Sequence, residues 1–175
     1  MRILLILILI LGLYFNSFIN VVFAQSSRSA SAVDSYTLFW PLTAGKTEGD
    51  SLYFLKLFKE QIRGWLIFDD TARADYAVLL GTKRVLEVEK LLKDGKNNLV
   101  IKTLDKADSE FSSAYSRIKA VASKGKLSAG EIRRDRLLNL KSLIDQLKTT
   151  APEEIRPGLD TAKDRIDSIL RDYLP

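Results

Sequence analysis

Apolar residues in the middle of the chain recur at alternating intervals of four and three, a spacing that places them on one face of an α-helix. The most regular stripe consists of Val100, Leu104, Ala107, Phe111, Ala114, Ile118 and Val121. Asn97 or Asn98 can cap the start of this helix, and Gly125 can end it. Such a helix is roughly 40 Å long, and its continuous seam predicts a long, straight partner.

A second stripe precedes the first and predicts that partner. Its members are Ala74, Val78, Gly81, Val85, Val88 and Leu92. We expect Asp70 to cap this helix and Gly95 to end it, while the small residues Ala74 and Gly81 let another helix approach closely. The short connection KDGKNN joins the two stripes, so together they predict a long central helical hairpin.

An earlier helix is predicted from residue 50 or 51 to about residue 69. Asp50 or Ser51 serves as its expected N-cap. Four apolar residues follow at three-four spacing, and we expect their side chains to face the core. They are Leu55, Phe58, Ile62 and Trp65.

Two further helices are predicted in the C-terminal part. Ser128 and Glu131 form a capping box for the first of them, whose core face is Leu137, Leu140, Ile144 and Leu147. Thr150 and Glu153 repeat that signature, but Pro157 with Gly158 should kink or restart the last helix, so its starting point stays open. Its stripe is Leu159, Ala162, Ile166, Ile169 and Tyr173.

The N-terminus reads as an export signal. Arg2 precedes an unbroken apolar run from Ile3 to Phe15, and Val22-Phe23-Ala24 resembles a small-x-small cleavage pattern, so residues 1–24 are interpreted as a signal peptide. An uncleaved anchor is the alternative, because Ile3 to Ala24 is long enough to span a bilayer if its polar residues are tolerated. Both alternatives place the rest of the chain outside the cytoplasm, as a secreted or cell-surface protein.

The remaining segments complete the domain organisation. Residues 25–35 are small and polar and predict a flexible spacer, whereas the aromatic and turn-forming residues of 36–50 predict an extended segment that packs on the bundle. Residues 51–175 form the predicted helical domain, since no segment shows the strict alternation of a strand. The expected fold class is all-α, an elongated bundle of about five helices with a long central hairpin after an N-terminal signal sequence.

Missing residue types narrow the possible functions. The chain has no Cys and no His, and its single Met is the initiator, so the usual ligands of zinc, copper and haem are absent and we expect no cofactor. Most catalytic bases and nucleophile partners are absent as well, so we expect a non-enzymatic protein. The alternative is an envelope hydrolase that uses a serine or a carboxylate pair, for which Asp69 and Asp70 are the nearest candidates, although helix capping already explains them.

Charge is unevenly distributed along the chain. Residues 116–148 hold nine basic and three acidic residues, and a contact with an anionic surface is possible there through Lys124, Lys126, Arg133, Arg134 and Arg136. Solvated helix faces are the plainer interpretation of these charges. We also expect solvated pairs where Lys83 faces Glu87 and Glu89 faces Lys93. Nucleic acid is not an expected partner, because no aromatic residues are interleaved with the basic run.

The stretch from residue 49 to residue 95 carries a family resemblance. Ser51-Leu52-Tyr53 with Leu55-Lys56, then Phe68-Asp69 with Ala72-Arg73-Ala74-Asp75, then Lys83-Arg84 with Glu87, Glu89 and Leu91 match three motifs in order. In this order they resemble the exported bacterial domain-of-unknown-function family five-six-six-seven, with a weaker likeness at 150–162. Leu80-Gly81 departs from the usual Ala-Glu pair. The resemblance implies an extracytoplasmic helical domain and brings no known ligand or reaction.

These observations favour one function class. We expect a non-enzymatic extracytoplasmic helical protein that contacts another envelope protein or an anionic surface polymer. A membrane contact is expected only through the N-terminal segment, if that segment is retained. The identity of the partner and the oligomeric state do not follow from the sequence.

Overall fold

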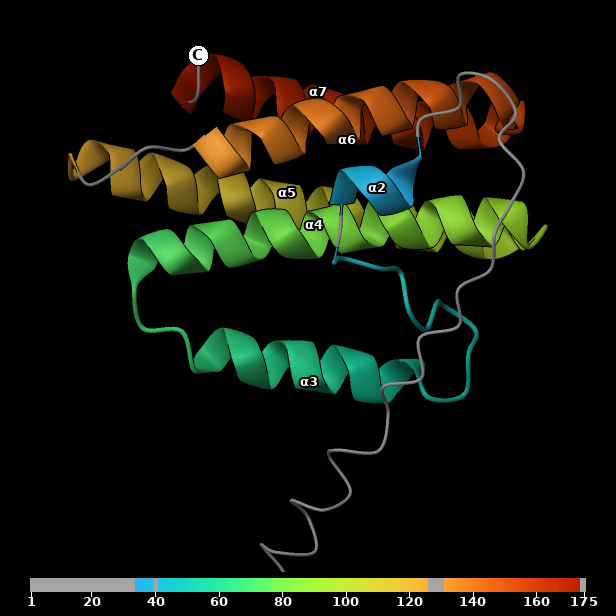
Figure 1. The fold of residues 1–175 in the computed structure, drawn as a ribbon, viewed down its shortest axis with the longest axis horizontal. Helices are drawn as coiled ribbons and strands as arrows, with labels where there is room; N and C mark the ends of the chain where they lie inside the picture. Colours follow the sequence, from blue (N-terminus) through green and yellow to red (C-terminus); the bar gives the residue numbers. More distant parts are fainter. Residues whose placement is uncertain (1–33, 40, 126–130, 174–175) are drawn as a thin grey trace, which may run out of the picture. The chain divides into compact units, whose positions relative to one another are not determined.

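The computed structural model describes residues 34–39, 41–125 and 131–173, and every regular element in these ranges is helical, which confirms the all-α prediction. The helices are α2 (Ser35–Phe39), α3 (Tyr53–Trp65), α4 (Asp70–Lys93), α5 (Asn97–Ser123), α6 (Glu131–Thr150) and α7 (Arg156–Tyr173), with a 3₁₀ turn at Glu153–Ile155 (Figure 1). Residues 32–175 form one compact unit. The predicted signal peptide lies outside the described residues, as does most of the predicted spacer.

Helices α4 and α5 form the predicted central hairpin (Figure 1). They contain 24 and 27 residues, so they extend about 36 and 40 Å at 1.5 Å per residue. The chain reverses at Gly95, whose φ of 69° is the left-handed conformation that glycine adopts without a steric penalty. The amide of Lys96 donates to the carbonyl of Leu91 at 2.9 Å, which satisfies an orphan carbonyl at the end of α4.

The apolar stripes of α4 to α7 meet in a single core. All seven seam residues of α5 are buried, and so are the predicted core residues of α6 and the first four of α7. Helix α7 packs on α5, α6 packs on α7 and α4, and the buried side chain of Phe39 brings α2 against the same core. No residue of α3 belongs to this core cluster.

Two glycines mark places where helices approach closely. A Cβ atom added to Gly81 of α4 would lie 2.5 Å from Cε1 of Phe111 in α5, and one added to Gly158 of α7 would lie 2.8 Å from Cδ1 of Leu104. Both distances are too short for real atoms, so each glycine makes room for a core side chain of α5. The expectation that Gly81 permits close packing is confirmed.

Several predicted helix starts differ from the observed ones. Helix α3 begins at Tyr53 after an N-cap, Leu52, that makes no side-chain cap bond, because Asp50 instead accepts a hydrogen bond from the amide of Thr47 at 2.7 Å. Asp69 rather than Asp70 caps α4, accepting from the amide of Ala72 at 2.7 Å. Short polar side chains serve turns and caps equally well, so a sequence signal locates such a boundary only to within one or two residues.

The segment before α3 and the entry to α7 also differ from expectation. Residues 35–39 form the short helix α2, whereas an extended segment was predicted from residue 36. Helix α7 begins at Arg156, so Pro157 lies in its first turn, where the missing amide costs nothing. The capping box predicted at Thr150 does not form, because α6 continues through that residue, and the box predicted at Ser128 lies outside the described residues.

Within the described ranges, no helix combines the length and the apolar character that crossing a bilayer requires.

Candidate functional site

Helix α3 is attached to α4 through its polar side. A buried guanidinium–carboxylate pair joins Arg84 of α4 to Glu60 of α3, and Lys83 adds a second contact to Glu60 at 2.9 Å. The hydroxyl of Tyr76 donates to the backbone carbonyl of Glu60 at 2.9 Å. Three side chains of α4 therefore bind Glu60.

A second carboxylate, Glu87 of α4, extends this network and is fully buried. It accepts hydrogen bonds from Arg84, from the Tyr53 hydroxyl at 2.8 Å and from Lys56 Nζ at 2.6 Å. Lys56 also donates to the carbonyls of Ala44 and Lys46, at 2.5 and 2.8 Å. The network thus attaches both α3 and the loop before it to α4.

The same loop is fastened to α5 by Glu48. Its carboxylate oxygens contact Lys102 at 2.6 Å and Lys106 at 2.5 Å. Lys106 Nζ also lies 4.7 Å from the centre of the Tyr53 ring, within cation–π range. Charged contacts therefore hold residues 44–60, together with the packing of Ala44 against the core.

Burial and ion pairing act in opposite directions on these carboxyl groups. Burial disfavours the ionised form of Glu60, but the charges of Arg84 and Lys83 outweigh that effect, so its pKa lies below the ordinary value. The pKa of Glu48 is lowered in the same way, because Lys102 and Lys106 outweigh its burial. The pKa of Arg84 is raised by Glu87 and Glu60 in spite of burial. The network is therefore a charged one at neutral pH.

The apolar side of α3 points away from the bundle, contrary to the prediction from its spacing. Leu55, Phe58, Ile62 and Trp65 were predicted to be core residues, yet their exposed fractions are 49, 56, 37 and 64%. Neighbouring large apolar side chains are exposed as well, namely Leu52, Phe54, Leu66 and Phe68. The spacing identified an amphipathic helix correctly, but α4 presents Arg84 and Glu87 to it, and Glu60 and Lys56 on the polar side of α3 bind these two groups.

Basic residues flank the exposed apolar side of α3, which we call the outer face. Lys59 and Arg63 are exposed next to Leu55 and Ile62, and Gln61 is exposed on the opposite flank. The one acidic residue of α3, Glu60, is buried against α4. The outer face therefore combines aromatic and aliphatic side chains with positive charge and carries no exposed carboxylate of its own helix.

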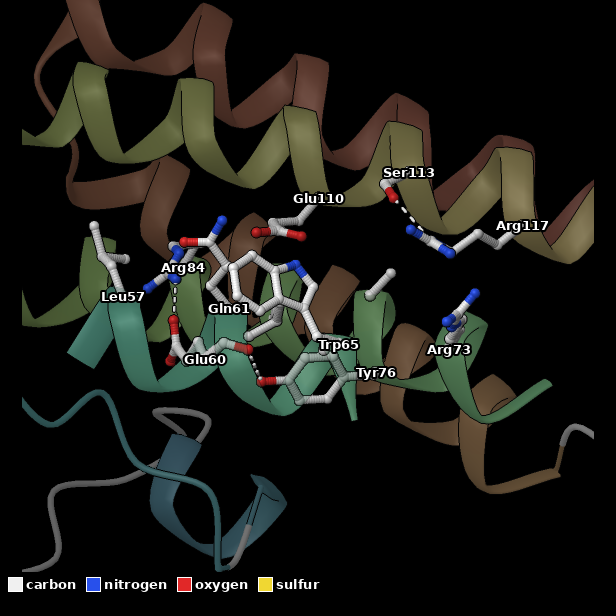
Figure 2. A pocket seen from close by; sticks show the side chains of 13 residues that line it. Leu57, Glu60, Gln61, Trp65, Arg73, Tyr76, Arg84, Glu110, Ser113 and Arg117 are labelled. Carbon is white, nitrogen blue, oxygen red and sulfur yellow. Dashed lines mark hydrogen bonds and ion pairs between the residues drawn. The ribbon is translucent and has the colours of Figure 1, made fainter. Parts of the chain in front are cut away.

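A cleft of about 480 Å³ lies between α3, α4 and α5 (Figure 2). Its walls include the side chains of Leu57, Trp65, Tyr76 and Leu80 together with charged groups. Glu110 of α5 projects into it without a hydrogen-bond or ion-pair partner among the described residues, and burial raises the pKa of its carboxyl group.

Two arginines lie at one end of the cleft (Figure 2). Arg73 donates through Nε to the carbonyl of Ile67 at 2.6 Å, and Arg117 donates through Nε to Oγ of Ser113 at 3.2 Å. In the described part of the chain, neither guanidinium group has a carboxylate partner. The cleft thus contains two guanidinium groups and one carboxylate that form no ion pair within the described residues.

The structure disperses the basic residues that the sequence singled out. Lys124 pairs with Asp70 at the start of α4, at 2.8 Å, while Arg134 is exposed and Arg136 is half-buried on α6. Lys126 and the side chain of Arg133 lie outside the described part. Elsewhere in this basic region, Lys141 and Lys148 pair with Asp167 and Asp160 of α7, which offsets part of its local charge.

The outward charge pairs predicted on α4 are half right. Glu89 and Lys93 form the expected pair at 2.6 Å, although Glu89 is buried. Lys83 binds Glu60 instead of Glu87, and Glu87 is buried as well. Two signals in the sequence pointed to this network. Arg84 and Glu87 stand next to the core positions Val85 and Val88, and Lys56 and Glu60 lie four residues apart on one face of α3.

Candidate catalytic or metal-binding groups are not gathered in the described residues. Asp69 serves as a helix cap, and Asp70 pairs with Lys124. Within the same ranges there is no cluster of three acidic side chains that could hold a metal ion.

Comparison with known proteins gives one match. The sequence model of a family described as Domain of unknown function (DUF5667) matches residues 45–141, from the loop before α3 into α6. This match covers the motifs at 49–95, whereas the weaker likeness at 150–162 lies beyond it. No curated protein and no solved structure matches the chain.

Proposed function

This chain belongs to the DUF5667 family of domains of unknown function, and we propose that it is a non-enzymatic extracytoplasmic protein whose helix α3 binds to an anionic lipid surface. The observation that carries the proposal is the orientation of α3, which buries its charged side against α4 and exposes its apolar side. In a water-soluble monomer, a contiguous apolar patch of this kind is usually an interaction site.

The composition of the outer face suits a lipid interface. Phe54, Phe58 and Trp65 supply aromatic rings, which favour the boundary between headgroups and acyl chains. A helix of this kind lies in the plane of the interface and does not cross it. The length of α3 agrees with that arrangement, since 13 residues cover only about 20 Å.

The charge of the outer face selects an anionic surface. Lys59 and Arg63 lie along its edge, and no exposed carboxylate of α3 opposes them. Each basic residue close to an anionic bilayer contributes about 1 kcal/mol. A protein partner with an apolar groove would not require this one-sided charge, and lipid is therefore the occupant that the composition favours.

The N-terminal apolar segment supports the same location. If the signal is cleaved after Ala24, α3 provides reversible attachment of an exported domain to the membrane. If the segment is retained, it holds α3 within reach of the bilayer. Under either fate, α3 is a better contact element than the basic region at 116–148, where several charges pair within the domain.

Vesicle co-sedimentation tests the proposal. A protein of residues 32–175 would be mixed with vesicles of phosphatidylcholine alone, or with 30% phosphatidylglycerol. We expect binding to the anionic vesicles that weakens with salt. Changing Phe54 and Phe58 to Ser should reduce it more than tenfold, because each buried ring contributes roughly 1.5–3 kcal/mol.

Two matched control variants distinguish binding through α3 from non-specific binding to vesicles. Ile101→Ser removes an exposed apolar side chain from α5 and should leave vesicle binding unchanged. Lys119→Gln removes an exposed charge from α5, and its effect should be smaller than that of the pair Lys59→Gln and Arg63→Gln. Equal binding by the double Phe variant and the unchanged protein would rule out α3 as the contact.

Sedimentation velocity tests the alternative that a second copy of the chain covers the outer face. If the outer face serves a second copy, the protein will dimerise without lipid, and the double Phe variant will be monomeric. A dimer of that kind, with no vesicle binding, would replace the lipid proposal.

A further inference from the structure

We infer that the cleft between α3, α4 and α5 is a binding site for a small zwitterion with an apolar side chain, of the size of an amino acid or a dipeptide. The anionic group of the ligand would bind Arg73 and Arg117, and its ammonium group would bind Glu110. This inference does not depend on the proposed lipid contact, because the cleft lies beside the outer face and its charged groups, Glu110, Arg73 and Arg117, come from α4 and α5; Trp65 contributes to both surfaces.

Glu110 supplies the cation-binding end. Its side chain is half-buried among the cleft residues, and no described residue forms an ion pair with it. Another cation of the wall, Arg84, already binds both Glu60 and Glu87. A ligand ammonium would supply the missing hydrogen bonds and charge at Glu110.

Arg73 and Arg117 supply the anion-binding end. Each uses its Nε to bind a neutral acceptor, which orients the guanidinium plane while its two Nη groups make no contact with a carboxylate of the described chain. Figure 2 shows both guanidinium groups at the same end of the cleft. Two such cations at one end are the arrangement that binds a carboxylate or phosphate in several hydrogen bonds.

The spacing along α5 limits the length of the ligand. Arg117 donates to Ser113, which follows Glu110 by three residues, so the backbone positions of Glu110 and Ser113 are about 4.5 Å apart along the helix axis. One or two residues of peptide cover such a distance, at about 3.5 Å each.

The walls and the size of the cleft agree with an apolar ligand body. Trp65, Tyr76 and Leu80 line the space between the charged ends. A volume of about 480 Å³ lies within the usual range of small-molecule sites, and an apolar wall with a few convergent polar groups is typical of them. The site therefore favours a side chain such as that of leucine or phenylalanine.

Isothermal titration of the protein of residues 32–175 with three peptides tests this assignment. The peptides are Leu-Phe, N-acetyl-Leu-Phe and Leu-Phe amide, which differ only in their terminal charges. We expect saturable binding of Leu-Phe and a loss of affinity of about tenfold or more when either terminus is blocked, because each block removes a charged hydrogen bond.

Variants assign each terminus to its end of the cleft. Glu110→Gln should bind Leu-Phe and its N-acetyl form equally, and Arg117→Gln should bind Leu-Phe and its amide equally. Lys119→Gln, an exposed change on α5 outside the cleft, should behave as the unchanged protein. The inference is overturned if no peptide binds saturably at millimolar concentration, if all three bind equally, or if the preference for free termini persists in both cleft variants.

Discussion

Arg84 on α4 binds Glu60 on α3 in a buried ion pair, and this contact reverses the orientation that the apolar spacing of α3 predicts. Arg84 also binds Glu87, so one guanidinium group joins the carboxylates of two helices. Since no residue of α3 belongs to the core cluster, the attachment of this helix depends on charged contacts that the rest of the bundle does not need.

Replacing Arg84 by Met should release α3 while α4 to α7 stay folded. The change leaves Glu60 and Glu87 buried with fewer cations, a situation that typically costs about 3–5 kcal/mol. Hydrogen exchange would show faster exchange of the amides of Tyr53–Trp65 and little change in α5. Arg134→Met, at an exposed position of α6, is the matched control. Uniformly faster exchange throughout the bundle would contradict a local role for Arg84.

Two phenylalanines should respond very differently to truncation. Phe111 is fully buried and Phe58 is 56% exposed. We expect Phe111→Ala to lower the free energy of unfolding by about 3–5 kcal/mol and Phe58→Ala to change it by no more than about 0.5 kcal/mol. Urea unfolding measures both. A large loss for Phe58→Ala would mean that the apolar side of α3 is packed in solution.

Two glycines, Gly81 of α4 and Gly64 of α3, should respond in opposite ways to substitution by alanine. Gly81→Ala places a Cβ atom 2.5 Å from the Phe111 ring, and the resulting overpacking should cost about 1–3 kcal/mol. At Gly64 the nearest atom to a new Cβ is Tyr76 Cε1 at 3.5 Å, an ordinary contact. Gly64→Ala should therefore stabilise α3 by up to about 1 kcal/mol through helix propensity. Thermal unfolding should shift in opposite directions, and a stabilising Gly81→Ala would disprove the close approach.

The raised pKa of Glu110 predicts that replacing it by the neutral residue Gln stabilises the fold, by an amount that depends on pH. A carboxyl group whose pKa is higher in the folded state than in the unfolded state stabilises the fold while protonated, and that stability is lost as pH rises through the folded pKa. Glu110→Gln should therefore be more stable than the unchanged protein at pH 7, and the difference should vanish below pH 4.5, the ordinary pKa. Denaturant titrations at pH 7 and pH 4 measure it, with exposed Glu154→Gln as the control.

Glu48 should show the opposite dependence on pH. Lys102 and Lys106 outweigh its burial and lower its pKa, so its stabilising effect is present above the ordinary pKa and disappears as pH falls through the lowered value. Glu48→Gln should be less stable than the unchanged protein at pH 6, and the two should converge below pH 4.5. If the two proteins differ by a constant amount across that range, the carboxylate charge of Glu48 is not what holds the loop.

Long, regular stripes made much of the fold predictable. The spacing predicts the seams of α4 and α5 and the core faces of α6 and α7, because each of these stripes meets the apolar stripes of neighbouring helices in one core. Helix ends were less predictable. Asp50, Asp69 and Asp70 could each cap a helix N-terminus. Which of them does so depends on local hydrogen bonds that the apolar spacing does not encode.

The candidate cleft was not predictable in the same way. Glu110, Arg73 and Arg117 come from two helices that pair along their length, and nothing in their sequence positions distinguishes them from solvated charges. Only the placement of α3 beside α4 and α5 makes them walls of one cleft.

By itself, the sequence determined an all-helical domain with a long central hairpin, and it determined that thiol, imidazole and thioether chemistry are missing from everything after Met1. The tertiary structure alone decided which side of α3 is buried. An amphipathic pattern specifies a polar and an apolar face on opposite sides of a helix. It does not specify which of the two packs against a neighbouring helix. Here α4 presents Arg84 and Glu87, which bind each other and also bind Glu60 and Lys56 of α3, so the polar face of α3 turns inward and its apolar face is left exposed.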